Sequence, residues 1–197
     1  MESEMKYSAN LTGAAFMFFE FKQVVLLKKQ FTDKEIRKKV IDENIFQYEK
    51  VSSLKRGIPT IIRRVNVLDE SLREMVSGDT LDIGKTINLY SIMKTDRLFY
   101  EFMVVVIKPH FDMNDYVLER KELNMYFTEK AEQVPEISSW SELTIGKLKQ
   151  VYMKILLESG ILANLKSGEL NRLLINEQVK EHLRHSGDSS YIEAIGG

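Results

Sequence analysis

Hydroxyl and arginine side chains recur in residues 52–63 at a spacing that suits the binding of phosphate groups. They are Ser52, Arg56, Thr60 and Arg63, at steps of four, four and three residues. Side chains three and four positions apart lie on one face of a helix, so these four should lie together. Guanidinium and hydroxyl groups on one face can hold the phosphates of a nucleic acid. A solvated polar face paired with acids from elsewhere in the chain fits the same spacing.

A second candidate surface lies further along the chain. Its members are Lys147, Gln150, Lys154 and Lys166. The first three follow one another at i, i+3 and i+7 and should share one helix face, and the fourth lies in the turn that follows. Lysines there can hold phosphates, and a glutamine can pair with the edge of an adenine in the major groove. Leu143 and Leu157 fall near the same face, so a protein contact is the alternative.

The basic side chains are concentrated early in the chain. Residues 22–64 carry 12 Lys and Arg against 5 Asp and Glu, a net charge of +7 that includes the run Arg37-Lys38-Lys39. Residues 69–136 carry 8 against 14, a net charge of −6, and the whole chain has a net charge of −1. A basic region on a nearly neutral protein favours a polyanionic partner, which Lys38 and Lys39 would contact. Attraction between the two oppositely charged segments is the alternative.

Residue patterns of known catalytic and metal sites are missing from the sequence. There is no cysteine, and the glycines at Gly78 and Gly84 lack the Lys-Ser/Thr that completes a phosphate-binding loop. His182 and His185 have a spacing that a metal can use, but the remaining ligands of a zinc site are not evident. We therefore expect a protein that is not an enzyme, with no metal and no cofactor.

Helical periodicity dominates the elements that must position these side chains. The pattern predicts about eight to nine helices, among them 16–30, a helix opening at the Thr32 to Glu35 capping box, 52–67, 119–133, one opening at a Ser139 to Glu142 capping box and ending at Ser159, and 176–185. Gly57 and Pro59 weaken the prediction of a helix over 52–67, because an interior proline removes a backbone donor.

After Gly160 the pattern changes to two short extended runs, 161–165 and 170–175, around a turn. This predicts a small β-hairpin, and the order of helix, turn, long helix and hairpin is that of a winged helix. The expected fold class is therefore all-α with one small C-terminal β-hairpin. We expect one compact domain over residues 1–197, with possible sub-lobes at 1–110 and 115–197.

No segment reads as a membrane span, since spanning takes about 20 predominantly apolar residues. Charged residues interrupt the run that starts at Phe16, and the run from Phe102 to Ile107 is only six residues long. Together with the lack of cysteine, this favours a cytoplasmic protein with no membrane contact.

Several stretches, in one order along residues 7–175, together resemble the BrxA family of bacterial phage-exclusion (BREX) systems. They are Tyr7-Ser8-Ala9-Asn10-Leu11-Thr12-Gly13, Arg63-Arg64 before Leu68-Asp69, Asp96-Arg97-Leu98-Phe99-Tyr100-Glu101-Phe102, and Trp140-x-x-x-Thr144-x-x-Lys147-Leu148-x-x-Val151 followed by Glu158-Ser159-Gly160-Ile161-Leu162. The resemblance implies a component of a phage-defence locus that also encodes a methyltransferase and ATPase-type proteins. It further implies a helical fold similar to that of the RNA-binding antitermination protein NusB, and it carries no catalytic motif.

Three functions fit these observations. The first is a non-enzymatic module that binds nucleic acid, specifically duplex DNA. The second is a scaffold whose basic and acidic regions dock other BREX proteins. The third, RNA binding of the NusB type, rests on analogy of fold alone.

Overall fold

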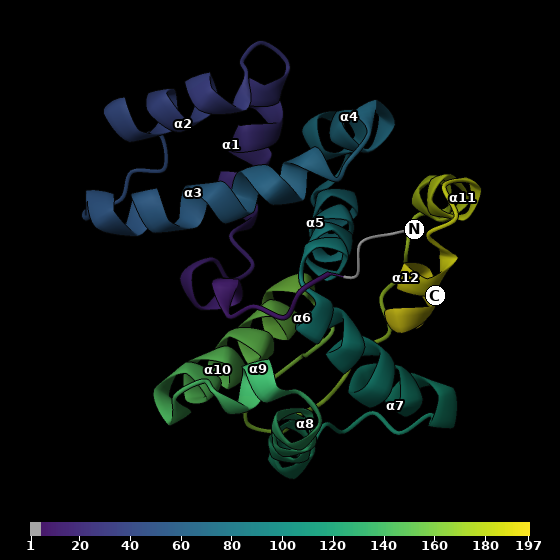
Figure 1. Cartoon of the computed structure of the whole chain (residues 1–197). Coiled ribbons are helices and arrows are strands. Elements are labelled where there is room, and N and C mark those ends of the chain that lie inside the picture. Colours follow the sequence, from purple (N-terminus) through teal and green to yellow (C-terminus); the bar gives the residue numbers. More distant parts are fainter. Residues whose placement is uncertain (1–4) are drawn as a thin grey trace. The chain divides into compact units, whose positions relative to one another are not determined.

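In the computed structural model, which describes residues 5–197, helices are joined by loops into two compact units (Figure 1). The N-terminal unit comprises residues 13–95, and the C-terminal unit comprises residues 5–12 and 96–197. Across the described residues, no helix is long and apolar enough to cross a membrane.

The N-terminal unit is built around one amphipathic helix, α3. The helices of the unit are α1 (Phe18–Lys28), α2 (Asp33–Asp42), α3 (Val51–Asn66), α4 (Glu70–Gly78) and α5 (Leu81–Thr95). The short helix η1 (Asn10–Gly13) spans the boundary, with residues 10–12 in the C-terminal unit. The capping box predicted at the start of α2 is confirmed, because the Thr32 hydroxyl accepts from the Glu35 backbone N–H and the Glu35 carboxylate accepts from that of Thr32. Helix α3 packs against α1, α2 and α5 and buries Leu54, Ile58 and Ile61 completely or nearly so.

Helix α3 runs without interruption through Gly57 and Pro59. Pro59 lies on the exposed side, where water can satisfy the carbonyl group that its missing N–H leaves without a donor. Gly57 lies on the buried side, and a Cβ there would be 3.3 Å from the Cε of Met17 and 3.5 Å from the carbonyl oxygen of Gly13. The two residues that weakened the helix prediction thus fit the helix, one through exposure and the other through close packing.

A buried arginine joins α3 to the chain that leads into α1. The Arg64 side chain is completely buried, and its guanidinium donates to the carbonyl oxygens of Ala14, of Ala15 at 2.7 Å and of Phe16 at 3.2 Å. Asn88 of α5 donates to the Phe16 oxygen as well, at 2.7 Å. Side chains from α3 and α5 therefore satisfy the backbone oxygens just before Met17, which enters α1 with a left-handed φ of 47°.

The C-terminal unit consists of helices of very different lengths. They are α6 (Arg97–Phe102), the π-helix η2 (Met103–Ile107), α7 (Lys108–Met113), α8 (Arg120–Gln133), α9 (Pro135–Ser138), α10 (Glu142–Ser159), α11 (Glu177–His185) and α12 (Ser189–Ala194). Gly160 ends α10 in the left-handed conformation that the sequence predicts, with φ 91°. The hydroxyl that caps α10 belongs to Ser141, which accepts from the Thr144 N–H at 3.2 Å, so the capping box predicted at Ser139 is wrong.

Aromatic side chains from α6, α8 and α10 form the core of this unit. Phe99 lies edge-on to Tyr152 at a centroid distance of 4.9 Å, and Phe102 and Phe127 lie beside the same ring. Tyr126 in turn lies edge-on to Phe102 at 5.3 Å. The Tyr126 hydroxyl donates to the Leu98 carbonyl oxygen at 2.6 Å. The Tyr152 hydroxyl is equally buried but has no hydrogen-bond partner among the described residues.

Glu101 of α6 fixes the first described residues of the chain to this core. Its carboxylate accepts from the Tyr7 hydroxyl at 3.0 and 3.1 Å, from Arg97 Nε at 2.8 Å and from Lys130 Nζ at 2.5 Å. The Arg97 guanidinium also lies over the Tyr7 ring, 4.4 Å from its centroid. One carboxylate therefore links the N-terminal segment, α6 and α8.

The prediction of a C-terminal β-hairpin is wrong, because residues 5–197 contain no β-strand. The wing expected for a winged helix is therefore not formed by these residues. The two runs touch at one isolated antiparallel bridge, Leu162 with Leu170. A third segment pairs with the other edge of the second run, because Leu170 N–H donates to the Tyr116 carbonyl oxygen and Val117 forms its own bridge with Glu169. Two residues further along, the Arg172 guanidinium donates to the carbonyl oxygens of Phe111 and Gly196. The second run thus turns to other partners, and its pairing with the first run does not extend into a strand.

Candidate nucleic-acid interface

Helices α2 and α3 carry the basic segment and lie side by side in opposite directions (Figure 1). The Asn66 side chain at the end of α3 donates to the Asp33 carboxylate at the start of α2, with a distance of 2.7 Å. Lys28 binds the same carboxylate, and these two hydrogen bonds lower the pKa of Asp33. The Asp33 carboxylate is thus engaged by Asn66 and Lys28, and the bond from Asn66 ties the start of α2 to the end of α3. The side chains on the outer surfaces of both helices project from this connected pair.

The stripe predicted on α3 is present for three of its four members. Ser52, Arg56 and Arg63 are exposed, whereas Thr60 is buried with 9% of its surface accessible. Each step of four residues turns a side chain about 40° around the helix, so Thr60 lies about 80° from Ser52, towards the core. Placing Thr60 among the phosphate-binding residues is therefore incorrect, and the exposed residue between the two arginines is Pro59.

The two lysines predicted on α2 differ in their surroundings. Lys38 is exposed and has no ion pair or hydrogen bond within residues 5–197. Lys39 is half-buried, pairs with Glu43 at 2.6 Å and lies over the Phe31 ring at 5.6 Å from its centroid. Lys38 is free to meet an external anion, and Lys39 already has an internal one.

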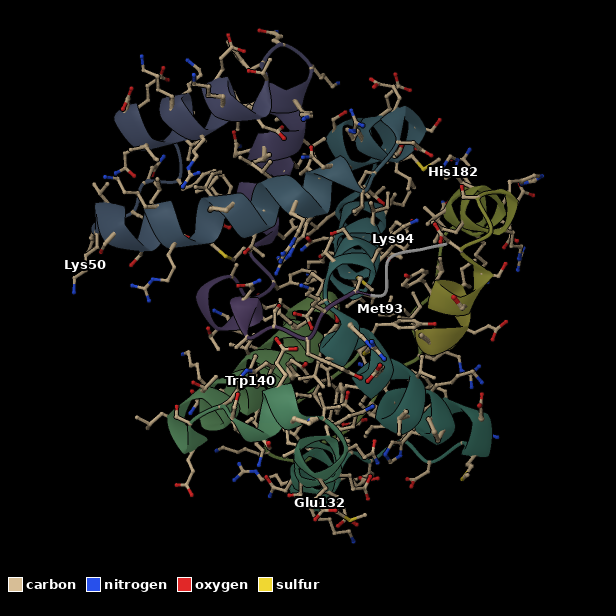
Figure 2. All side chains as sticks on the ribbon, viewed as in Figure 1. Lys50, Met93, Lys94, Glu132, Trp140 and His182 are labelled. Atoms are coloured by element: carbon tan, nitrogen blue, oxygen red, sulfur yellow. The ribbon has the colours of Figure 1, made fainter. Side chains whose placement is uncertain are left out.

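A larger group of cations on these two helices has no partner in the described part of the chain. This group, named here the α2–α3 cations, consists of Lys34, Arg37, Lys38, Lys50, Lys55, Arg56 and Arg63. Figure 2 shows Lys50 projecting from the start of α3. Among the acids nearby, Glu35 caps α2 and Glu43 pairs with Lys39, whereas Asp42 and Glu49 have no partner in the described chain, so seven cations face two available carboxylates. The surface of α2 and α3 therefore carries an excess of uncompensated positive charge.

The second predicted surface lies in the C-terminal unit, on α10 and the loop that follows. Lys147, Gln150 and Lys154 are all exposed, and Lys154 has a weak pairing with Glu158 at 3.6 Å. Lys166 is exposed in a turn in which its backbone N–H donates to the Asn164 side chain at 2.7 Å. These four residues are as accessible as phosphate binding requires.

A groove connects this surface to residues that the sequence did not single out. A cavity of about 460 Å³ lies between α8, α10 and the turn, with Gln150, Arg120 and Leu165 in its wall. Lys166 follows Leu165, so the groove places its turn next to Gln150. Arg120 is exposed and has no partner in the described chain. The sequence could not group Arg120 with this surface by spacing, because Arg120 is the first residue of α8 and the other members lie on α10 and in the turn.

The histidines that the sequence considered as ligands are engaged in local contacts. His185 Nδ1 lies 2.7 Å from the Glu181 carbonyl oxygen, and His182 lies one turn earlier on α11. Over the described residues, no three His, Asp or Glu side chains are grouped as they are at a metal ion.

Comparison with known proteins links the chain to one family along nearly its whole length. The BrxA family model matches residues 5–187. A protein of Bacillus cereus named BREX protein BrxA is 40% identical over 200 residues, covering 100% of both chains. A protein of the same name from Paramagnetospirillum magneticum is 23% identical and covers 98% of both chains.

One solved structure has the same fold. The crystal structure of an uncharacterized protein from Magnetospirillum magneticum superposes with a TM-score of 0.83, at 23% sequence identity, over 96% of this chain and 97% of that one.

Proposed function

The chain belongs to the BrxA family, and we propose that it serves a BREX phage-defence system as a non-enzymatic component that binds duplex DNA in the cytoplasm. The observation that carries the DNA proposal is the group of α2–α3 cations. The whole chain has a net charge of −1, so this group of seven cations is a local departure from a nearly neutral surface. Those of α2 and α3 leave a region of positive potential that suits a polyanion.

The chemistry of these cations suits the sugar-phosphate backbone. Arg56 and Arg63 present guanidinium groups, which bind phosphate oxygens through two parallel hydrogen bonds, and Ser52 adds a hydroxyl donor. Contacts of this type position a protein on nucleic acid without reading its sequence. Base reading falls to Gln150 on the second surface, whose amide can pair with an adenine in the major groove.

Duplex DNA is favoured over a single strand because these helices lack exposed aromatic side chains. Proteins that bind single strands commonly stack successive bases on exposed aromatic rings. The sequences of α2 and α3 contain no aromatic residue. Helix α10 contains one, Tyr152, and that ring is buried in the aromatic core. Binding through phosphates then depends on the regular spacing of a duplex.

Fluorescence anisotropy with labelled duplex DNA, single-stranded DNA and RNA of equal length tests this proposal. We expect the highest affinity for the duplex, and log K should fall linearly with log salt concentration, by about 0.9 for each phosphate contacted. Tighter binding to RNA than to duplex DNA would identify RNA, rather than DNA, as the ligand. The absence of salt-dependent binding to any of the three would make the chain a protein scaffold rather than a nucleic-acid binder.

A further inference from the structure

The C-terminal unit contains a groove that takes no part in the proposed contacts with DNA. It lies between η2 and α7 on one side and α8 on the other, and its volume is about 330 Å³. Val105, Met113 and Met125 line it and are 55%, 77% and 59% exposed. Large apolar side chains gathered at the mouth of a groove, rather than scattered singly, are typical of a binding surface.

The wall of the groove is formed by an irregular helix. Val105 and Val106 belong to the π-helix η2, whose wider turn inserts an extra residue into the path from α6 to α7. Single π-helical turns are uncommon and are found frequently at functional sites. Methionine side chains at the rim add a surface that adapts to different apolar partners, since the thioether chain is flexible and polarisable.

One carboxylate on the same rim lacks a cation of its own. Glu129 lines the groove and has no ion pair or hydrogen bond to a described residue. The neighbouring lysines are already engaged: Lys108 with Asp112 at 2.6 Å, and Lys130 with Glu101 at 2.5 Å. Lys121 likewise pairs with Glu119 at 2.7 Å. The negative charge of Glu129 is therefore left for an external partner.

Two further acids at the groove are held in place by a buried histidine. His110 Nε2 lies 3.0 Å from a Glu122 carboxylate oxygen, and its Nδ1 lies 3.1 Å from the Asp115 carbonyl oxygen and 3.4 Å from the Asp115 carboxylate. Both ring nitrogens thus face oxygens of groove residues. This arrangement joins α7 to α8 and gives the acidic side of the groove a fixed shape.

We propose that this groove docks a basic amphipathic segment of a protein partner, with apolar side chains against Val105, Met113 and Met125 and a lysine or arginine against Glu129. An amphipathic helix laid into an apolar groove is a common mode of peptide recognition. A basic residue on it supplies the charge that the rim lacks, and its aliphatic stem packs along the methionines. The proposal is independent of DNA binding, because none of the residues proposed to contact DNA lines the groove.

Methyl NMR of the full chain, with labelled methionines, tests the groove directly. The probe is a synthetic helical peptide of leucine and lysine, and the control peptide has glutamate at each lysine position. We expect the basic peptide to shift the methyl signals of Met113 and Met125 in a saturable manner, and the acidic peptide to leave them unchanged. Met153, which lines the other groove beside Arg120, is the internal control and should not respond.

Two variants separate this interaction from general attraction between charges. Glu129→Lys should weaken binding of the basic peptide about tenfold, and Glu132→Lys, at an exposed position on α8, should change it less than twofold. Equal shifts at Met153, or equal effects of the two variants, would overturn the proposal. So would the absence of any saturable shift up to about 1 mM peptide. Shifts of Met113 and Met125 that depend on protein concentration alone would assign the groove to a second copy of the chain instead.

Discussion

Arg63 and Arg64 are consecutive residues of α3, but their side chains lie in opposite environments. Arg63 is exposed with no partner in the described chain, and Arg64 is completely buried, with its guanidinium on the carbonyl oxygens of residues 14–16. A rotation of about 100° per residue separates the two. One member of the pair is available to a ligand, and the other holds the entrance to α1.

Replacing Arg64 with methionine should destabilise the protein, because the carbonyl oxygens of residues 14–16 would remain buried after losing charged donors. Such losses cost about 3 kcal/mol in the free energy of unfolding. Arg63→Met is the matched control and should change that free energy by less than about 0.5 kcal/mol. Urea denaturation followed by circular dichroism measures both. Equal stability of the two variants would contradict the anchoring role of Arg64.

Reversing the charge of both exposed arginines, Arg56→Glu with Arg63→Glu, should weaken binding to duplex DNA at least tenfold without loss of helicity. Each phosphate contact that is lost should make the salt dependence shallower by about 0.9, so a change of about 1.8 is expected. The double variant Lys180→Glu with Arg184→Glu on α11 changes the net charge equally and is the control. If the control weakens binding as much, net charge rather than the α3 surface determines affinity.

Periodicity predicted the helices of this chain well, and its failures have local causes. Apolar spacing located α3 and α8 to within about two residues because each buries one face. It also contained a signal for Arg64, which continues the buried spacing of Gly57 and Ile61, although its residue type is polar. Thr60 was misplaced because steps of four drift around the helix.

The β-hairpin was predicted incorrectly because strand patterns describe one segment and its neighbour in sequence. Two backbone hydrogen bonds join the two runs here, and residues 116–118, more than 40 residues upstream, pair with the opposite edge of residues 168–170. The groove at Met113 and Met125 was also beyond prediction, since its walls belong to separate helices and its shape depends on the π-helix. Both are tertiary effects that no single stretch of sequence records.

Replacing Lys147, Lys154 and Lys166 with alanine in one variant tests the second surface. If that surface binds phosphates, affinity for duplex DNA falls and the salt dependence becomes shallower by about 0.9 per lost contact. The pairing of Lys154 with Glu158 is exposed, so its loss should cost under about 1 kcal/mol in stability. An unchanged salt dependence, combined with loss of binding to another BREX protein, would identify this face as a protein contact.

The two buried tyrosines of the aromatic core should respond in opposite directions to removal of the hydroxyl group. Burial raises the pKa of both Tyr126 and Tyr152, so each hydroxyl stays neutral. Tyr152→Phe removes a buried group that has no partner among the described residues and should raise the free energy of unfolding by about 1 kcal/mol. Tyr126→Phe loses the bond to the Leu98 oxygen and should lower it by about 1 kcal/mol. Denaturation of both variants is the measurement, and destabilisation by Tyr152→Phe would show that its hydroxyl has an unrecognised partner.

The carboxylate of Glu101 should give the protein a pH-dependent part of its stability. Burial alone would raise the pKa of Glu101, but hydrogen bonds from Lys130, Arg97 and Tyr7 outweigh it, and the pKa lies below its ordinary value of 4.5. A group whose pKa is lower in the folded state stabilises that state above the unfolded pKa, and this contribution is lost as the pH falls through the folded pKa.

Glu101→Gln should therefore be less stable than the parent at about pH 7, and the difference should shrink as the pH is lowered from about 5 to about 3. Glu132→Gln is the control, because this side chain projects from α8 and has no partner within residues 5–197 (Figure 2). The difference in free energy of unfolding between the parent and the control should stay constant over the same range. Urea denaturation at several pH values measures all three proteins. A difference for Glu101→Gln that does not change with pH would mean that the bonds from Lys130, Arg97 and Tyr7 do not depend on the charge of the carboxylate.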